Sequence, residues 1–202
     1  MSEAERIEKE SFEFIASKLT VPFPEVEVVK RVVHTTADFG LVDLMAFTNG
    51  AVTEGVKAIK GGRDVITDVK MVVAGISASS LERFGGRVQC HISDEEIKAL
   101  AGREGITRAR AAFRLHKAEL EGNIVAIGNA PTALFELCDA VRHGLRPALV
   151  VGVPVGFVGA KESKEELLKL PVPSIVVRGN RGGSTIAVAI VNALIKLAEK
   201  DG

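Results

Sequence analysis

The feature that most constrains the fold of this chain is a strand, tight turn and helix pattern over residues 123–143. Asn123–Ile127 is short, apolar and β-branched, which is typical of a buried strand. Gly128–Leu134 (GNAPTAL) follows, with Pro131 suited to the first turn of a helix that runs to His143 and stops at Gly144. Such a turn points backbone N–H groups and the positive end of a helix dipole at one place. We therefore expect the turn to favour an anion.

The same alternation of short apolar strands and helices continues along the chain. Besides 123–127, strands are predicted at 64–67, 87–92, 148–152 and 173–178, and helices at 3–19, 24–34, 51–60, 69–75, after 93, at 104–121, after 163 and after 184. Asp68, Ser93–Glu96 and Ser163 are expected to cap helices. This pattern predicts an α/β fold, a three-layer α/β/α sandwich with a five-stranded parallel sheet. No repeat or linker divides residues 1–202, so we expect one domain.

Composition excludes several classes of protein. The formal net charge is zero and Trp and Tyr are absent, which argues against nucleic-acid binding. No apolar run approaches the ~20 residues of a membrane span, and the acidic N-terminus does not resemble a signal peptide. Isolated Cys90 and Cys138 are expected to be buried, reduced thiols of a cytoplasmic protein. Four scattered histidines show no metal-ligand spacing, so no metal site is expected, and GxxxxGK[ST] and GxGxxG are both missing.

Three loops follow predicted strands and should meet at the carboxyl edge of the sheet, where ligands of such folds bind: GNAPT, GVPVGFVGA and RGNRGGS. Arg178 and Arg181 in the last loop offer planar forks suited to carboxylate or phosphate. A solvated turn is the alternative for that loop. Arg108 opens a helix in ITRARAAFR, where a solvated helix face is the alternative.

His34 is the candidate proton donor. It lies at the end of a predicted element, beside Thr35, Thr36 and Asp38. An imidazole can donate or accept a proton near neutral pH.

The chain resembles the precorrin-8X methylmutase family, the methyl-migrating isomerases of corrin ring synthesis, in HTT at 34–36, GNAPTAL at 128–134, PVGFVGAKESK at 154–164 and RGNRGGS at 178–184. The similarity runs from Ser11-Phe12 to the closing helix. It implies a five-stranded parallel α/β/α sandwich and a homodimer with sites close to the subunit interface. The implied reaction of cobalamin biosynthesis moves a methyl group from carbon 11 to carbon 12 of (cobalt-)precorrin-8. Because the methyl never leaves the substrate, no S-adenosylmethionine or other cofactor is implied, and any cobalt arrives inside the substrate.

The resemblance also implies roles for individual residues. The family's active histidine falls on His34, which would protonate the macrocycle, and its substrate-contacting serine falls on Ser11. Arg108 falls on the arginine of the helix-opening segment. The remaining substrate-binding residues are expected to be Ser77, Asn129, Arg178 and Arg181.

The chain departs from the family pattern at two places. Many members have Cys-Gly where this chain has Thr36-Ala37, and many carry a TRxR-like string where it has Ser77-Ala78-Ser79-Ser80. Thr-Thr-Ala-Asp is closer to the cobalt-first branch. Two other functions stay open: a tetrapyrrole carrier without catalysis, and an α/β enzyme acting on a phosphorylated small molecule.

Overall fold

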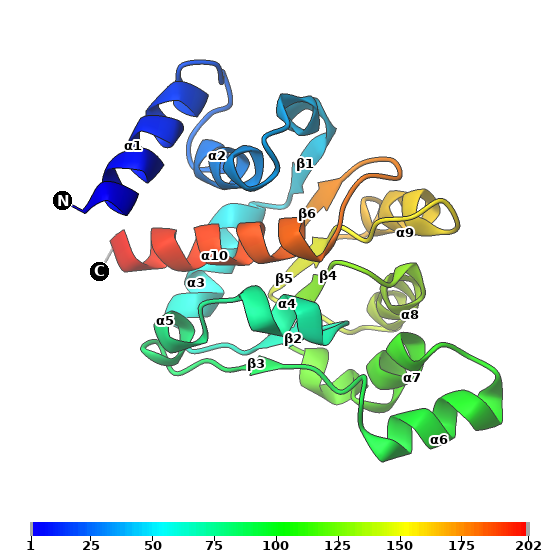
Figure 1. Cartoon of the computed structure of the whole chain (residues 1–202). Coiled ribbons are helices and arrows are strands. Elements are labelled where there is room, and N and C mark those ends of the chain that lie inside the picture. Colours follow the sequence, from blue (N-terminus) through cyan, green and yellow to red (C-terminus); the bar gives the residue numbers. More distant parts are fainter. Residues whose placement is uncertain (1, 201–202) are drawn as a thin grey trace.

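The computed structural model describes residues 2–200, and the strands of this part form one six-stranded sheet (Figure 1). Its order is β1-β6-β5-β4-β2-β3. The strands are β1 (Met45–Thr48), β2 (Val65–Thr67), β3 (Val88–Gln89), β4 (Ile124–Ile127), β5 (Leu149–Gly152) and β6 (Ser174–Val177). Neighbours from β6 to β3 pair in parallel, whereas β1 pairs antiparallel with β6.

The five predicted strands are therefore confirmed as parallel, but the prediction of a five-stranded sheet is wrong by one edge strand. The segment Met45–Thr48 carries no strand signal in the sequence, because it has only four residues and its apolar and polar side chains do not alternate. In the structure all four residues are half-buried. Its place is fixed by pairing with β6, where Met45 lies opposite Val177. The result is a mixed sheet, as antiparallel edge strands commonly produce.

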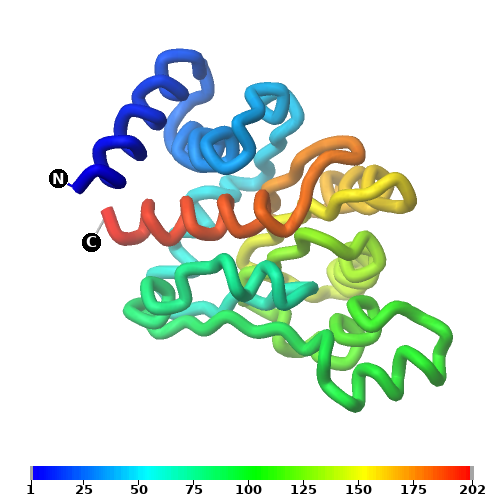
Figure 2. The backbone as a smooth tube through the Cα atoms, viewed as in Figure 1, coloured from blue at the N-terminus to red at the C-terminus, as the bar shows by residue number. Residues whose placement is uncertain are grey.

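Helices cover both faces of the sheet. One face carries α2 (Glu25–Thr36), α3 (Ala51–Lys60), α4 (Lys70–Gly75), α5 (Ala78–Glu82) and α10 (Ser184–Lys200), and the other carries α6 (Glu95–Glu104), α7 (Arg108–Leu115), α8 (Pro131–Arg142) and α9 (Ala160–Leu167). Short 3₁₀ helices occupy Phe39–Leu44 and Lys117–Leu120. The first helix, α1 (Glu3–Ala16), packs on α2 and lies beside the end of α10 (Figure 2).

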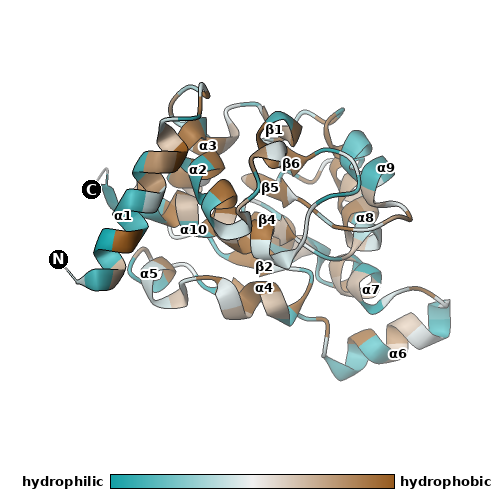
Figure 3. Ribbon diagram, turned by 45° about the horizontal axis from the view of Figure 1, so that its top comes forward, coloured by the Kyte–Doolittle hydropathy of each residue, from teal (hydrophilic) through white to brown (hydrophobic). Residues whose placement is uncertain are grey.

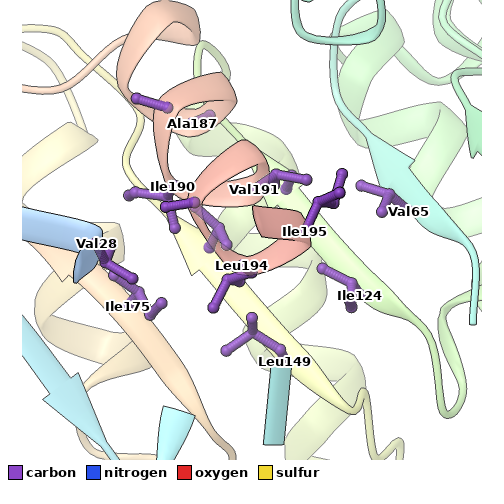
Figure 4. Packing of buried hydrophobic residues seen from close by; sticks show 14 of the residues in the cluster. Val28, Val65, Ile124, Leu149, Ile175, Ala187, Ile190, Val191, Leu194 and Ile195 are labelled. Carbon is purple, nitrogen blue, oxygen red and sulfur yellow. The ribbon is translucent and has the colours of Figure 1, made fainter. Parts of the chain in front are cut away.

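Helix α10 is the centre of the larger core. Ile190, Val191 and Leu194 face the strand residues Ile124 and Leu149 (Figure 4). Each apolar side chain of this size contributes roughly 1.5–3 kcal/mol when fully buried. In Figure 3 the hydrophobic colours gather on the strands and on the helix faces turned to them. Since α10 covers several strands at once, its first residues are held firmly against the carboxyl edge.

Several local expectations were wrong because tertiary partners outweigh local ones. The helix expected at 104–121 begins only at Arg108, after Gly105 ends α6 in a left-handed conformation. Asp94 is the N-cap of α6 but makes no capping bond, since it contacts His91 instead. Ser163 is buried inside α9, where its hydroxyl donates to the Ala160 carbonyl. The first helix ends at Ala16.

The two cysteines are free thiols in different surroundings. Cys138 is buried as expected, and burial raises its pKa to about 12. Cys90 is only half-buried, so the expectation was wrong for it. Among residues 2–200, no helix combines the length and hydrophobicity needed to cross a membrane.

Candidate functional site

The three glycine-rich loops meet at the carboxyl edge, as expected. A Cβ on Gly128 would lie 2.7 Å from the Ser184 Cα, so only glycine lets the GNAPT turn reach the start of α10. The Gly183 N–H donates to the Val153 carbonyl at 2.8 Å. The Gly156 N–H donates to the Asn180 carbonyl at 3.1 Å. The two bonds join the loops 153–159 and 178–184, and the close approach at Gly128 brings loop 128–130 against them.

The anion expected at the GNAPT turn is part of the protein. The Asp68 carboxylate, 1% exposed, accepts hydrogen bonds from the N–H groups of Gly128 (3.1 Å), Asn129 (2.8 Å) and Ala130 (2.7 Å). The pKa of Asp68 is above its ordinary value, because burial raises it by more than these backbone donors lower it. The predicted free anion site is therefore wrong, as is the prediction that Asp68 caps α4, whose N-cap is Val69. The carboxylate fixes the turn from inside.

His34 lies in the last turn of α2 and is half-buried. Its Nδ1 is 2.8 Å from the Ser11 hydroxyl of α1, and its ring stacks on Phe12 with centroids 4.8 Å apart. One helix thus orients an imidazole carried by another. With Nδ1 engaged by Ser11, Nε2 is the nitrogen left to meet a ligand.

An ion pair borders this imidazole. Arg31, one turn before His34, donates to Glu8 at 2.8 Å and lies over the Phe12 ring at 4.5 Å. The hydrogen bond from Arg31 lowers the pKa of Glu8, and the nearby His34 lowers it further. The charged groups of α1 and α2 therefore hold the Phe12 and His34 rings in place.

Arg181 forms an ion pair with Asp38, which connects the 178–184 loop to the end of α2. Beside this pair is a depression of about 270 Å³ lined by Thr36, Asp38, Leu41, Val155, Arg181, Gly182 and Ile186. The Lys164 ammonium supports the loop from below by donating to the Arg181 carbonyl at 2.7 Å. Burial lowers the pKa of Lys164 to about 8.

Three other predicted site residues, Arg178, Asn129 and Arg108, lie along the same edge, and these three and Ser77 are exposed. Arg178 follows β6, and Asn129 follows β4. Arg108 opens α7, next to α8 through a 2.7 Å contact between the Thr107 and Thr132 hydroxyls. Arg108 is thus on the far side of β6 and β5 from His34.

Helices α4 and α5 lie on the opposite flank of α10 from α2 (Figure 1), and Ser77 is in the link between them. Its backbone N–H donates to the Asn192 side chain at 2.9 Å, and the Asn192 amide donates to the Gly75 carbonyl. The structure therefore joins His34 to Ser11 and links Arg181 to the end of the same helix through Asp38, whereas Arg108 and Ser77 lie farther from His34.

Sequence reasoning missed Phe12 and Lys164 at this site. It named Asp38 only as a neighbour of His34, and it interpreted Asp68 as a helix cap. The sequence did offer a signal for Lys164, because this lysine lies on the apolar side of α9, where a charged side chain is unusual. The partner of Asp68 is 60 residues away in sequence, so no local pattern could reveal it. The four histidines are scattered in the sequence, but the fold stacks His91 on His116.

A sequence model of the precorrin-8X methylmutase family matches residues 6–197. The cobalt-precorrin-8 methylmutase of Priestia megaterium is 45% identical over 96% of this chain and 88% of its own. That of Leptospira interrogans is 42% identical over 97% and 94%. The crystal structure of a precorrin-8X methylmutase from Thermus thermophilus superposes with a TM-score of 0.88 at 42% identity, covering 97% of this chain and 98% of that one.

Proposed function

Because this chain belongs to the precorrin-8X methylmutase family, we propose that His34 is the acid of its reaction, the migration of a methyl group within a corrinoid precursor of cobalamin. The protein is an isomerase. The observation that carries the assignment to His34 is its contact with Ser11, which leaves one ring nitrogen for the substrate.

The reaction needs positioning and charge stabilisation more than a nucleophile. The methyl group leaves carbon 11 and bonds to carbon 12 of the same ring, so no donor is consumed. His34 gives a proton to the macrocycle, and the ring releases one in turn because substrate and product are isomers. A fixed imidazole beside the ring favours the rearranged product.

The carboxyl edge supplies groups that match a ring with acetate and propionate side chains. Arg178, Arg181 and Arg108 are exposed cations suited to carboxylates, and Asn129 would add a polar contact. Ser77, on the flank of α10, would contact the ring from the side. Phe157 and Val158 are 93% and 89% exposed on the 153–159 loop. Exposed apolar side chains in such a loop suit the flat face of a macrocycle.

We further propose that the substrate contains cobalt and that the enzyme works as a cytoplasmic homodimer. The Priestia and Leptospira relatives are both named for a cobalt-containing substrate. Support for a dimer comes from apolar side chains left in solvent on α1, Ile7 and Phe14. Turnover of the cobalt-containing and the metal-free macrocycle, compared side by side, tests the first point.

The experiment for His34 is a single-turnover assay. Wild-type protein, His34→Ala and His143→Ala are mixed with the macrocycle without a methyl donor, and the visible spectrum is followed. His143 is an exposed histidine at the end of α8 and serves as the matched control. We expect product with wild type and His143→Ala, and a rate at least ~100-fold lower with His34→Ala at unchanged affinity.

Two results would contradict the proposal. If His34→Ala converts the substrate at the wild-type rate, His34 is not the acid. If wild-type protein binds the macrocycle and leaves its spectrum unchanged, the chain is a carrier instead.

A further inference from the structure

A cluster of titratable side chains at the β3 edge of the sheet takes no part in the proposed reaction. We call it the His91–His116 cluster; its members are His91, Asp94, Glu96, His116 and Glu119. The two imidazole rings stack with centroids 3.8 Å apart and an interplanar angle of 8°. β3 and β1 are opposite edges of the sheet, and α2 packs against β1, so the cluster is remote from His34.

Glu119 orients both rings from one side. Its two oxygens lie 2.8 Å from His91 Nε2 and 2.7 Å from His116 Nδ1. A carboxylate only accepts hydrogen bonds, so each of these nitrogens carries a proton. Glu119 therefore fixes the orientation of both rings.

On the other side of the stacked pair, the lone pair of His116 Nε2 faces carboxylate oxygens, which are hydrogen-bond acceptors as well. His116 Nε2 is buried and has no hydrogen-bond partner. Among residues 2–200, every other buried side-chain nitrogen or oxygen has one. Glu96 Oε1 lies 3.5 Å from it, and one ligand atom each of Asp94, Glu96 and His116 lies within 4.8 Å of the other two. A lone pair pointed at two carboxylates is unfavourable unless a positive charge lies between them.

Both nitrogens of His91 have partners, because Nδ1 is 3.0 Å from Asp94 and Nε2 contacts Glu119. His116 Nε2 is therefore the nitrogen of the stacked pair that has no hydrogen-bond partner. A cation placed between this nitrogen and the carboxylates of Asp94 and Glu96 gives all three groups a partner.

We propose that this cluster binds a divalent first-row transition metal ion through His116 Nε2, Asp94 and Glu96. Imidazole with carboxylate oxygens is a donor set that Zn²⁺ accepts. Glu119 is the partner that fixes the ring of a ligating histidine by accepting its other N–H. The ion ties the start of α6 to the end of α7, the helix that begins at Arg108.

Titration of the full-length, chelator-treated protein with Zn²⁺ by calorimetry tests the proposal. We expect one ion per wild-type chain and an increase in Tm on binding. Glu96→Gln and His116→Gln should each weaken binding at least ~10-fold, and Glu119→Gln should weaken it by ~10–100-fold although it removes no ligand. His143→Gln is the matched control and should bind as the wild type does.

The Glu96→Gln variant keeps the test decisive if His116→Gln fails to fold, because Glu96 is 62% exposed and at the surface. The proposal is overturned if the wild type takes up no Zn²⁺. It is also overturned if Glu96→Gln binds with wild-type affinity, or if His143→Gln loses binding as strongly as Glu96→Gln does.

Discussion

The His34 ring is held from both sides, by the Ser11 hydroxyl at Nδ1 and by the face of Phe12. Side-chain rotamers that move the ring away from Ser11 and Phe12 break these contacts. In the proposed mechanism Ser11 is a positioning residue that acts through the imidazole, in place of the substrate contact that the resemblance implies.

Ser11→Ala should therefore lower kcat by about 10-fold, which corresponds to about 1.4 kcal/mol in the barrier, with KM unchanged. Loss of the hydrogen bond frees the ring without removing the acid. Ser11→Thr keeps a hydroxyl and should recover most of the rate. Ser17→Ala, which removes a hydroxyl bonded to the Phe14 carbonyl just after the same helix, is the control; an equal loss in both would contradict the role of Ser11.

Lys164 makes a second prediction at the scale of one residue. Burial holds its pKa at about 8, below the ordinary 10.5. Between these two values the unfolded chain binds more protons than the folded chain, so this group adds stability as pH rises. The unfolding free energy of the wild type minus that of Lys164→Met should therefore increase by about 1–3 kcal/mol from pH ~7 to ~10.

Urea unfolding of both proteins at the two pH values measures this difference, and comparing the two cancels the other groups that titrate in this range. A difference that stays constant with pH would show that Lys164 keeps its ordinary pKa when folded.

At the scale of elements, the junction of β4 and α8 depends on Asp68. Its carboxylate satisfies three N–H groups of residues 128–130 that would otherwise be orphaned at the start of a helix. The turn is thus a rigid part of the site, and the ligand meets its side chains and not its N–H groups.

Asp68→Asn should destabilise the protein by about 1–3 kcal/mol. The side-chain amide would place its own N–H groups against the backbone N–H groups of residues 128–130, and the substitution removes the charge from the remaining hydrogen bonds. The midpoint of urea unfolding measures the loss. Asp139→Asn, on the exposed side of α8, should change stability little. If both variants unfold at the same urea concentration, Asp68 does not hold the turn.

The sequence was sufficient for elements that carry their own signal. The β-branched runs of β2, β4, β5 and β6 and the proline and glycine around α8 identified the parallel core. Strand β1 carried no such signal, since Met45–Thr48 becomes a strand only by pairing with β6. The place of His34 at a helix end followed from the sequence, whereas Ser11 was identified by resemblance alone. The Asp68 contact and the His91–His116 stack join distant segments, which only the folded chain brings together.

At the scale of the whole molecule, α1 contributes to one site and leaves an apolar face uncovered. Phe14 is 60% exposed, and its ring meets that of Phe39 at 6.4 Å in an edge-to-face contact. Such a face is typical of a surface covered by another subunit. A dimer formed there would also fix Ser11, which lies one turn away on the same helix.

Sedimentation should accordingly give twice the mass of one chain for the wild type. Changing Ile7 and Phe14 together to Ser should shift the protein towards the single-chain mass, because it removes apolar area from the interface. Leu115→Ser changes an exposed apolar residue at the end of α7, on the other face of the sheet, and should leave the mass unchanged. A wild type that sediments as a single chain would contradict the dimer.

The central claim is that one imidazole at the end of α2 meets the macrocycle while the loops of the carboxyl edge hold the ring. A crystal structure of the protein with its bound corrinoid product measures this through the distance from His34 Nε2 to the nearest ring atom. We predict a separation within about 3.5 Å, with Arg181 on a ring carboxylate. A ring bound elsewhere on the surface, or with His34 turned away from it, would contradict the account.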